Sequence, residues 1–181
     1  MSAKFDFKKY LTDNFIESGT YKGDGVIRAI KAGFKNLYSV EIHEPNYNNS
    51  RNRINNFIKK NKLDISFPNI YLGDCVQVFP KIMTEINSKS TFWLDGHAAK
   101  KWYGAKSSNC PLLEELEIIK NHHIKNHIIM IDDLRIIRNE AWGEKDISEE
   151  ILIEKIKTIN SDYKFSYEDG HVEKDCLIAY I

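Results

Sequence analysis

Short apolar runs alternate with longer segments of helical periodicity along most of the chain. A run that is continuously apolar and only a few residues long predicts a buried parallel strand. Five such runs lie at 14–18, 37–42, 70–72, 91–94 and 127–131. Between them, apolar residues recur at helical spacing, which predicts helices at 24–32, 45–60, 75–86 and from Pro111 onward. Strands that alternate with helices predict an α/β domain built on a parallel sheet.

The end of the chain departs from this alternation. Ser148, with acids behind it, predicts a capped helix to about Ile159. The apolar runs at 163–167 and 176–181 then follow with no helix between them. Strands joined so closely pair antiparallel, so the sheet is predicted to be mixed, with an antiparallel edge. The segments 96–110 and 134–146 lack a regular period, and 96–110 is predicted to be a lid over a binding site.

Composition places the chain among ordinary globular domains. Its 181 residues, 42% of them hydrophobic, suffice for one domain with a sizeable core. Lys and Arg total 26, as do Asp and Glu, so the formal net charge is zero and nothing attracts the whole chain to nucleic acid or an anionic membrane. The first nine residues have no apolar core, and the three cysteines are widely spaced. We therefore expect one cytoplasmic domain over 1–181, with reduced thiols and no nucleic-acid or membrane partner; the oligomeric state is open.

A glycine-rich turn follows the first predicted strand. Residues 17–23 read Glu-Ser-Gly-Thr-Tyr-Lys-Gly, so an acid ends the strand and glycines lead into the next helix. Glycine lets the backbone turn sharply and approach a ligand, and the free N–H groups of a helix start attract polar or anionic groups. This arrangement is typical of a cradle for a nucleotide-type cofactor. The candidate contacts are Glu17, Gly19, Thr20, Tyr21 and Gly23.

Acids also end the later strands, where the carboxyl ends of a parallel sheet form a ligand crevice. Glu41 lies about twenty residues beyond the glycine turn, the offset at which a carboxylate accepts hydrogen bonds from both ribose hydroxyls. The alternative for Glu41 is a solvated acid at a strand end. Asp74 and Cys75 are expected beside the base of the cofactor, although Asp74 could equally cap the helix that follows.

Three further acids suggest a metal site. Asp95, Asp132 and Asp133 are hard oxygen ligands at neighbouring strand ends and suit Mg²⁺ or another divalent cation. Asp133 could instead cap a turn, and Asp95 is also a candidate for catalysis and for cofactor contact. For His97, the roles of general base, metal-proximal ligand and plain loop histidine are all open. The histidines at 122, 123 and 127 are expected at a solvated boundary rather than in a metal cluster.

Taken in order, these motifs resemble those of class I S-adenosylmethionine-dependent methyltransferases, nearest to the metal-dependent catechol O-methyltransferase-like group. The motifs lie at 17–23, 39–42, 73–80, 92–97 and 131–133. The resemblance implies a Rossmann-like fold with helices on both faces of a seven-stranded mixed sheet, in the order 3-2-1-4-5-7-6. It also implies S-adenosylmethionine as cofactor, with its methionine part on the glycine turn and its ribose on Glu41, and a metal held by Asp95, Asp132 and Asp133.

Two positions depart from that group. Its members have an asparagine where Asp133 stands, and their catalytic lysine falls at Ala98 here. His97, Lys100 or Lys101 would then have to act as the base. The departures leave the cofactor motifs unchanged and bear only on the metal and the proton transfer.

The function that these features favour is metal-assisted O-methylation of a small-molecule or sugar hydroxyl. A nucleic-acid methyltransferase acting on amino groups is disfavoured, because Asp95-Gly96-His97-Ala98 stands where such enzymes carry an Asn/Asp-Pro-Pro-aromatic motif. Two alternatives stay open. One is a catalytically silent module that binds the cofactor without turnover. The other is an NAD-type Rossmann oxidoreductase, which the absence of a G-x-G-x-x-G motif disfavours.

Overall fold

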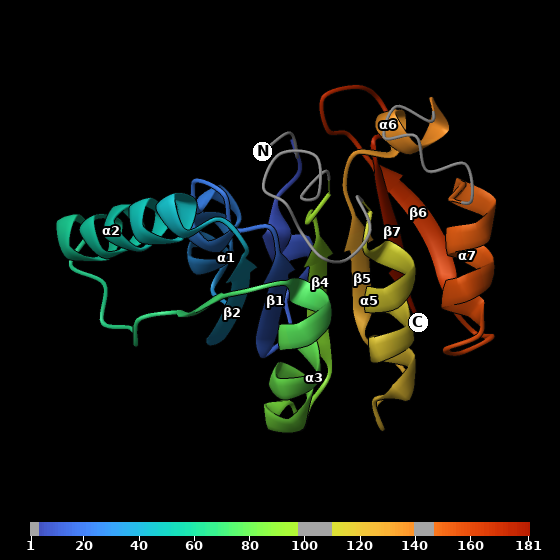
Figure 1. The fold of residues 1–181 in the computed structure, drawn as a ribbon, viewed down its shortest axis with the longest axis horizontal. Helices are drawn as coiled ribbons and strands as arrows, with labels where there is room; N and C mark the ends of the chain where they lie inside the picture. The colour runs from blue at the N-terminus through green and yellow to red at the C-terminus, as the bar shows by residue number, and fades with distance from the viewer. Residues whose placement is uncertain (1–3, 98–109, 140–146) are drawn as a thin grey trace.

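The computed structural model describes residues 4–97, 110–139 and 147–181. Across these ranges the chain builds a seven-stranded sheet with the strand order β3-β2-β1-β4-β5-β7-β6, which confirms the order that the resemblance implied (Figure 1). The strands are β1 Asn14–Ser18, β2 Asn36–Glu41, β3 Asn69–Leu72, β4 Ser90–Leu94, β5 Ile128–Ile131, β6 Lys164–Glu168 and β7 Cys176–Tyr180.

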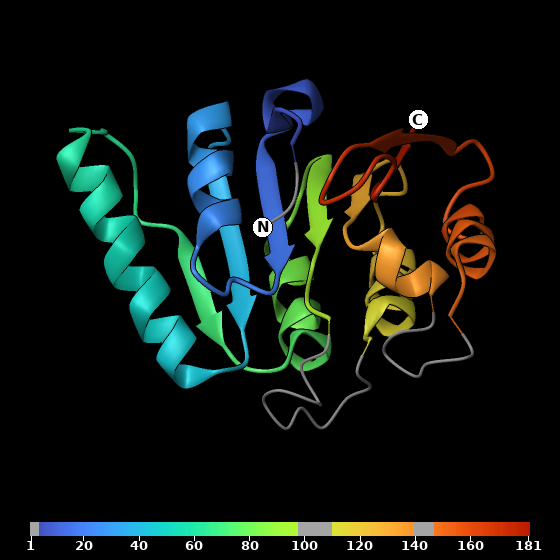
Figure 2. The same cartoon turned by 90° about the horizontal axis from the view of Figure 1, so that it is seen from above.

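The pairing of the strands also follows the prediction of a mixed sheet. β1 pairs parallel with β2 and β4, β2 with β3, and β4 with β5. β7 runs antiparallel between β5 and β6. The parallel strands therefore end at one edge of the sheet, here called the carboxyl edge, and begin at the opposite amino edge (Figure 2).

Helices cover both faces of the sheet. They are the 3₁₀ helix η1 Phe7–Tyr10 and the α-helices α1 Asp24–Ala32, α2 Glu44–Lys60, α3 Cys75–Glu85, α5 Leu112–Asn121, α6 Leu134–Arg138 and α7 Glu149–Lys157. Side chains of α3, α5 and α7 share a core with one face of the sheet, and those of η1 and α1 share a core with the other. Figure 1 shows α3 and α5 in front of the sheet. In β1, for example, Ile16 belongs to the first core and Phe15 to the second, as the alternation of a strand requires.

The segment 134–146 differs from its prediction. It was expected to lack regular structure, yet α6 occupies its first residues. The helix forms because Leu134 and Ile137 are both buried, which a five-residue pattern in the sequence is too short to reveal. Residues 140–146 lie outside the described part of the chain, and so do residues 98–109 of the predicted lid. No helix within the described ranges has the length and apolar character that a membrane crossing requires.

A chain of hydrogen bonds ties two histidines into the amino edge. The N–H of Ser90 donates to His127 Nδ1 at 3.1 Å, which leaves the proton of a neutral His127 on Nε2. His127 Nε2 lies 2.9 Å from His122 Nδ1, and His122 Nε2 lies 3.2 Å from the carbonyl oxygen of Ile86. His122 and His127 are only 6% and 0% exposed. The expected solvated boundary is therefore wrong for both histidines. His122 ends α5 and lies over the start of β5, so the two side chains are buried and hydrogen-bond to groups of the protein.

Candidate functional site

The glycine turn is fixed against two neighbouring strands. Gly19 has a φ of +85°, and a Cβ at this position would lie 2.4 Å from the carbonyl oxygen of Asp95, so only glycine fits between the ends of β1 and β4. The N–H groups of Gly19 and Thr20 both donate to the carbonyl oxygen of Val40, at 3.0 and 3.1 Å. Gly23, also left-handed, is the N-cap of α1. The turn is thus held in one conformation at the start of a helix.

Glu41 lies against this turn. Its Oε2 accepts a hydrogen bond from the N–H of Tyr21 at 2.6 Å, and its Oε1 accepts one from the N–H of His43 at 2.9 Å. Glu41 is 4% exposed, so the alternative of a solvated strand-end acid is wrong. Tyr21 has a φ of +46°, a left-handed conformation that is uncommon for a tyrosine, and the bond to Glu41 helps to hold it there. The acid predicted to bind ribose is therefore part of the cradle itself.

Glu17 is a second buried acid at the same place, on the α1 side of β1. Ser39 donates to Glu17 Oε2 at 2.6 Å, and the hydroxyls of Thr20 and Ser39 lie 2.5 Å apart. Burial raises the pKa of Glu17 to about 8, and the nearby charges of Glu41 and Asp24 act in the same direction. At neutral pH the Glu17 carboxyl accordingly holds its proton for most of the time.

Asp74 is the N-cap of α3. Its Oδ1 accepts a hydrogen bond from the N–H of Val76 at 3.1 Å, which is the capping alternative that the sequence left open. Burial raises the pKa of the neighbouring Cys75 thiol, so that this group stays neutral. A role for either residue beside the base of a cofactor stays a prediction.

Asp95 and His97 follow β4 directly. Loss of solvent raises the pKa of Asp95 well above its ordinary value, and the charges of Asp132 and Asp133 raise it further. Burial lowers the pKa of His97, so its imidazole is neutral near pH 7 and has a lone pair to accept a proton. His97 Nδ1 lies 3.9 Å from Cys110 Sγ. Lys100 and Lys101, the other candidate bases, lie outside the described residues.

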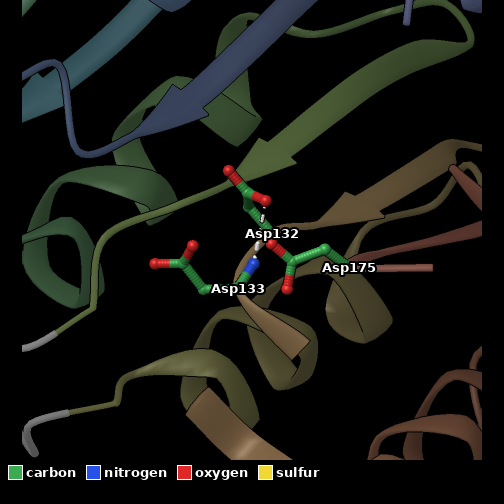
Figure 3. A group of neighbouring side chains, drawn as sticks. All are labelled: Asp132, Asp133 and Asp175. Carbon is green, nitrogen blue, oxygen red and sulfur yellow. Dashed lines mark hydrogen bonds between the residues drawn. The ribbon is translucent and has the colours of Figure 1, made fainter. Parts of the chain in front are cut away.

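Three carboxylates converge where β5 ends and β7 begins. Oxygens of Asp132, Asp133 and Asp175 lie within 4.8 Å of one another, and they are the described residues that form such a group (Figure 3). The predicted set had Asp95 in place of Asp175. The difference arises because β7 inserts beside β5 and brings a residue 42 positions further along the chain than Asp133 (175 − 133) to this point.

Arg135 lies between two of these acids. Its Nη1 donates to Asp133 Oδ1 and to Asp175 Oδ2, both at 2.6 Å. Burial would raise the pKa of Asp175, but hydrogen bonds from Arg135 and from the N–H of His171 lower it below the ordinary value. Asp133 is the residue before α6 but makes no side-chain capping bond to that helix. Asp133 therefore pairs with a cation of the protein itself, which argues against the alternative that its side chain caps a turn.

Asp132 is held from two sides. Its Oδ1 accepts hydrogen bonds from the N–H of Asp133 at 2.9 Å and from the thiol of Cys176 at 3.0 Å. Asp132 is 1% exposed, and burial raises the pKa of Cys176, which keeps the thiol protonated as a donor. Both bonds fall on one oxygen, so the orientation of the carboxylate is fixed.

Sequence reasoning missed Glu115, Arg135, Asp175 and Cys176. Glu115 had a visible signal. It sits on α5 at the helical spacing of Leu112, Leu116 and Ile119, so it is an acid on the apolar stripe of the helix, and the structure buries it completely. The other three are brought to the site by α6 and by the insertion of β7. Neither feature leaves a pattern that a sequence alone reveals.

No protein-family model and no curated protein sequence matches this chain. Solved structures do match over 97% of it. An O-methyltransferase from Bacillus cereus in complex with S-adenosylhomocysteine aligns over 76% of its own length, at a TM-score of 0.60 and 10% identity. TomG from Streptomyces achromogenes, an O-methyltransferase of tomaymycin synthesis in complex with S-adenosylmethionine, aligns over 75% at 0.59 and 9%. The chain has the class I methyltransferase fold. The glycine turn and the strand-end acids lie at the carboxyl edge of that fold.

Proposed function

We propose that this protein is an S-adenosylmethionine-dependent methyltransferase acting on oxygen. The observation that carries the proposal is the cradle formed by the glycine turn and Glu41, in which a turn that only glycine permits and a buried acid meet at the start of a helix. A nucleoside cofactor with a sulfonium and an amino-acid group offers partners for both parts. The two O-methyltransferases of the same fold that carry S-adenosylhomocysteine or S-adenosylmethionine support this reading.

Different residues of the carboxyl edge would bind the two parts of the cofactor and accept the proton of the acceptor. The turn from Glu17 to Gly23 would hold the methionine part, and Glu41 would accept the ribose hydroxyls. During transfer, a carbon–oxygen bond to the acceptor forms as the carbon–sulfur bond breaks, and S-adenosylhomocysteine leaves. The acceptor loses its hydroxyl proton, and neutral His97 is the described residue beyond Asp95 that can accept one. Holding acceptor and methyl group in line supplies much of the rate.

A divalent cation such as Mg²⁺ would fit beside Asp132. The observation that favours a cation is the convergence of carboxylate oxygens at this edge, among them those of Asp132 and Asp133. Burial first, and then the charges of these two residues, raise the pKa of the nearby Asp95. Asp132, Asp95 and the Asp133 oxygen not paired with Arg135 would hold the ion. Such an ion, when bound, lowers the pKa of a coordinated hydroxyl and orients it. Arg135 already neutralises part of the group, so we expect the affinity for the cation to be modest.

The acceptor that we propose is a small molecule or a sugar with a free hydroxyl. This rests on the O-methyltransferases among proteins of the same fold and on the absence, at 95–98, of the motif that amino-directed nucleic-acid enzymes carry. A cytoplasmic location and the absence of nucleic-acid and membrane partners stay predictions.

Calorimetry with S-adenosylhomocysteine tests the proposal. Wild type should bind it, and Glu41→Ala should lose on the order of 1.5 to 3 kcal/mol, because hydrogen bonds to a charged group are removed and two N–H groups of the cradle lose their acceptor. Asp64→Ala, which removes an exposed acid, is the matched control and should bind as wild type does. Binding of NAD with no response to S-adenosylhomocysteine would refute the proposal.

A second measurement separates an enzyme from a silent binding module. Transfer of a labelled methyl group from S-adenosylmethionine should be followed over a panel of phenols, sugars and hydroxy acids, with and without Mg²⁺. Transfer to any hydroxyl supports the enzyme. Tight binding of S-adenosylhomocysteine without methyl transfer to any member would favour the silent module.

A further inference from the structure

Glu115 is a buried acid without a hydrogen-bond partner. It lies on α5, is 0% exposed, and neither of its carboxyl oxygens has a partner anywhere in the described ranges. The hydroxyl of Ser18 is buried and unpartnered in the same way. Buried polar groups in proteins are nearly always hydrogen-bonded, so two such groups side by side require an explanation.

Contacts place this pair beneath the carboxyl edge. Ser18 is the last residue of β1, directly before the glycine turn, and a Cβ on Gly96 would lie 3.1 Å from Ser18 Oγ. The hydroxyl of Ser18 and the thiol of Cys75 lie close enough to the Glu115 carboxyl to favour its charged form, although neither has the geometry of a hydrogen bond. Glu115 thus lies where the ends of β1 and β4 meet the first turn of α3.

Stability does not account for Glu115. Burial raises its pKa to about 7, and the charges of Glu114 and Asp74 act in the same direction. The described neighbours that do most to set this pKa are Cys75, Ser18, Glu114 and Asp74, and none of these four is basic. A buried carboxyl without a partner costs free energy that an apolar side chain of similar size would not. An acid of this kind, beside a proposed ligand site, is more readily explained by the ligand than by the fold.

We propose that Glu115 accepts a hydrogen bond from the 6-amino group of the adenine of the cofactor. This inference rests on the proposed function and names a residue that discriminates among nucleobases. Under the proposed function, the methionine part and the ribose would lie on the opposite side of β1, where Glu17, Thr20 and Glu41 lie. Ser18 and Glu115 lie on the face of the sheet that α3 and α5 cover, and Oδ1 of Asp74, an acid near Glu115, already caps a helix.

The test compares two ligands that differ in one group. S-adenosylhomocysteine carries a 6-amino donor, and S-inosylhomocysteine carries a 6-oxo acceptor in its place. Their dissociation constants should be measured by calorimetry at a pH of about 8.5, where a carboxyl with a pKa of about 7 is ionised. Wild type should prefer the adenine compound by at least about tenfold.

Two substitutions at the same position sharpen the result. Glu115→Gln gives the side chain an N–H₂ group that can donate to the 6-oxo group, so the preference should narrow by about tenfold or reverse. Glu115→Leu should abolish the preference while raising the thermal midpoint, because it removes an unpartnered buried acid. Glu114→Gln, the neighbouring acid, should leave the preference unchanged.

Each outcome decides the matter. If wild type binds S-adenosylhomocysteine and Glu115→Gln keeps the same preference, the inference is wrong while the proposed function stands. If wild type binds neither compound, both are wrong. A crystal structure of wild type with S-adenosylhomocysteine makes the decision independent of variant folding, since a 6-amino nitrogen beyond hydrogen-bond distance of Glu115 overturns the inference directly.

Discussion

The two edges of the sheet treat buried polar groups in opposite ways. At the amino edge, each histidine of the chain from Ser90 to Ile86 has both ring nitrogens in hydrogen-bond contact. At the carboxyl edge, the carboxyls of Glu17, Asp95 and Glu115 all have raised pKa values, because burial and mutual repulsion are not balanced by cations. The polar groups of the amino edge are satisfied within the protein, whereas burying the carboxyls of the carboxyl edge costs free energy that a ligand or a cation can lower.

The contrast gives the edges opposite responses to pH. At the amino edge, burial lowers the pKa of a histidine in the folded chain, so the protein loses stability as the pH falls below the pKa of an unfolded histidine. At the carboxyl edge, burial raises the pKa of a carboxyl in the folded chain, so the protein loses stability as the pH rises toward that raised pKa. The protein without ligand should therefore be most stable between these limits. The variants below separate the two contributions, from the largest effect to the smallest.

Gly19→Ala should distort the glycine turn at the carboxyl edge and so weaken ligand binding. The new Cβ would lie 2.4 Å from the carbonyl oxygen of Asp95, in a backbone conformation that alanine avoids, so the turn must move. Binding of S-adenosylhomocysteine should fall by more than about a hundredfold, or about 2.7 kcal/mol. Gly33→Ala is the matched control, since Gly33 is also left-handed but has no atom within 4 Å of the added Cβ. Equal loss of binding in both variants would mean that the effect is global.

His127→Phe should interrupt the hydrogen bonds of the amino edge and lower the free energy of unfolding. It removes the acceptor of the Ser90 N–H and the partner of His122 Nδ1, at a cost of about 2 to 3 kcal/mol near neutral pH. Urea unfolding measures this loss. His123→Gln, at an exposed neighbour, should cost little.

His127→Phe should also weaken the dependence of folding stability on pH in the acid range. Burial lowers the pKa of His127 to about 3, with the charges of His122, His123, Lys89 and Lys125 acting in the same direction. Below a pH of about 6.5 the unfolded chain binds a proton that the folded chain does not, so wild-type stability should fall by up to about 1.4 kcal/mol per pH unit for each such proton. An acid limb that is unchanged in His127→Phe would place the titration elsewhere.

Glu17→Gln should weaken the loss of folding stability that the protein without ligand shows as the pH rises. The folded carboxyl has a pKa of about 8 against an ordinary 4.5, so the folded state binds the extra proton. Its contribution to stability is complete below a pH of about 4.5 and is lost as the pH rises through about 8. Between pH 6 and 8 the wild type should lose about 2 kcal/mol more than the variant. Asp64→Asn serves as the control, and an identical alkaline limb in wild type and Glu17→Gln would contradict the prediction.

Asp132→Asn should remove the response to metal. At ten times its dissociation constant, Mg²⁺ should add about 1.4 kcal/mol to wild-type stability, seen as a rise in the thermal midpoint. Asp133→Asn should keep most of that rise, because Arg135 already pairs with Asp133 Oδ1. The proposed cation site is wrong if Mg²⁺ leaves the wild-type midpoint unchanged.

Much of the fold follows from the sequence because its signals are local. The bounds of β1 and α1 agree with their predictions, since a short apolar run and a glycine at each end of the helix mark them without reference to other parts of the chain. Acids at strand ends were also visible, since each follows directly on an apolar run. Their convergence at one edge followed from the parallel sheet.

What the sequence did not reveal depends on contacts between distant segments. Asp175 and Cys176 reach Asp132 only because β7 lies between β5 and β6, and a linear pattern does not say which carboxylates end up adjacent. The sequence pattern around His122 and His127 suggested solvated side chains, because the burial of a strand start depends on the helix that packs against it, here the end of α5. Glu115 was missed for a different reason: its place on the apolar stripe of α5 was visible, but an acid in the first turn of a helix is ordinarily explained by the helix dipole.

The position of β7 also has a consequence for the order of folding. A strand that inserts between two earlier strands cannot take its place until both partners are present, and β7 is the last strand of the described chain to be synthesised. β5 must therefore stay unpaired on one side while β6 and β7 emerge. Because Cys176 on β7 holds Asp132, the acid at the end of β5 reaches its final orientation only when this late strand docks. Folding intermediates should accordingly contain the glycine turn in place before the aspartates near Asp132 are ordered.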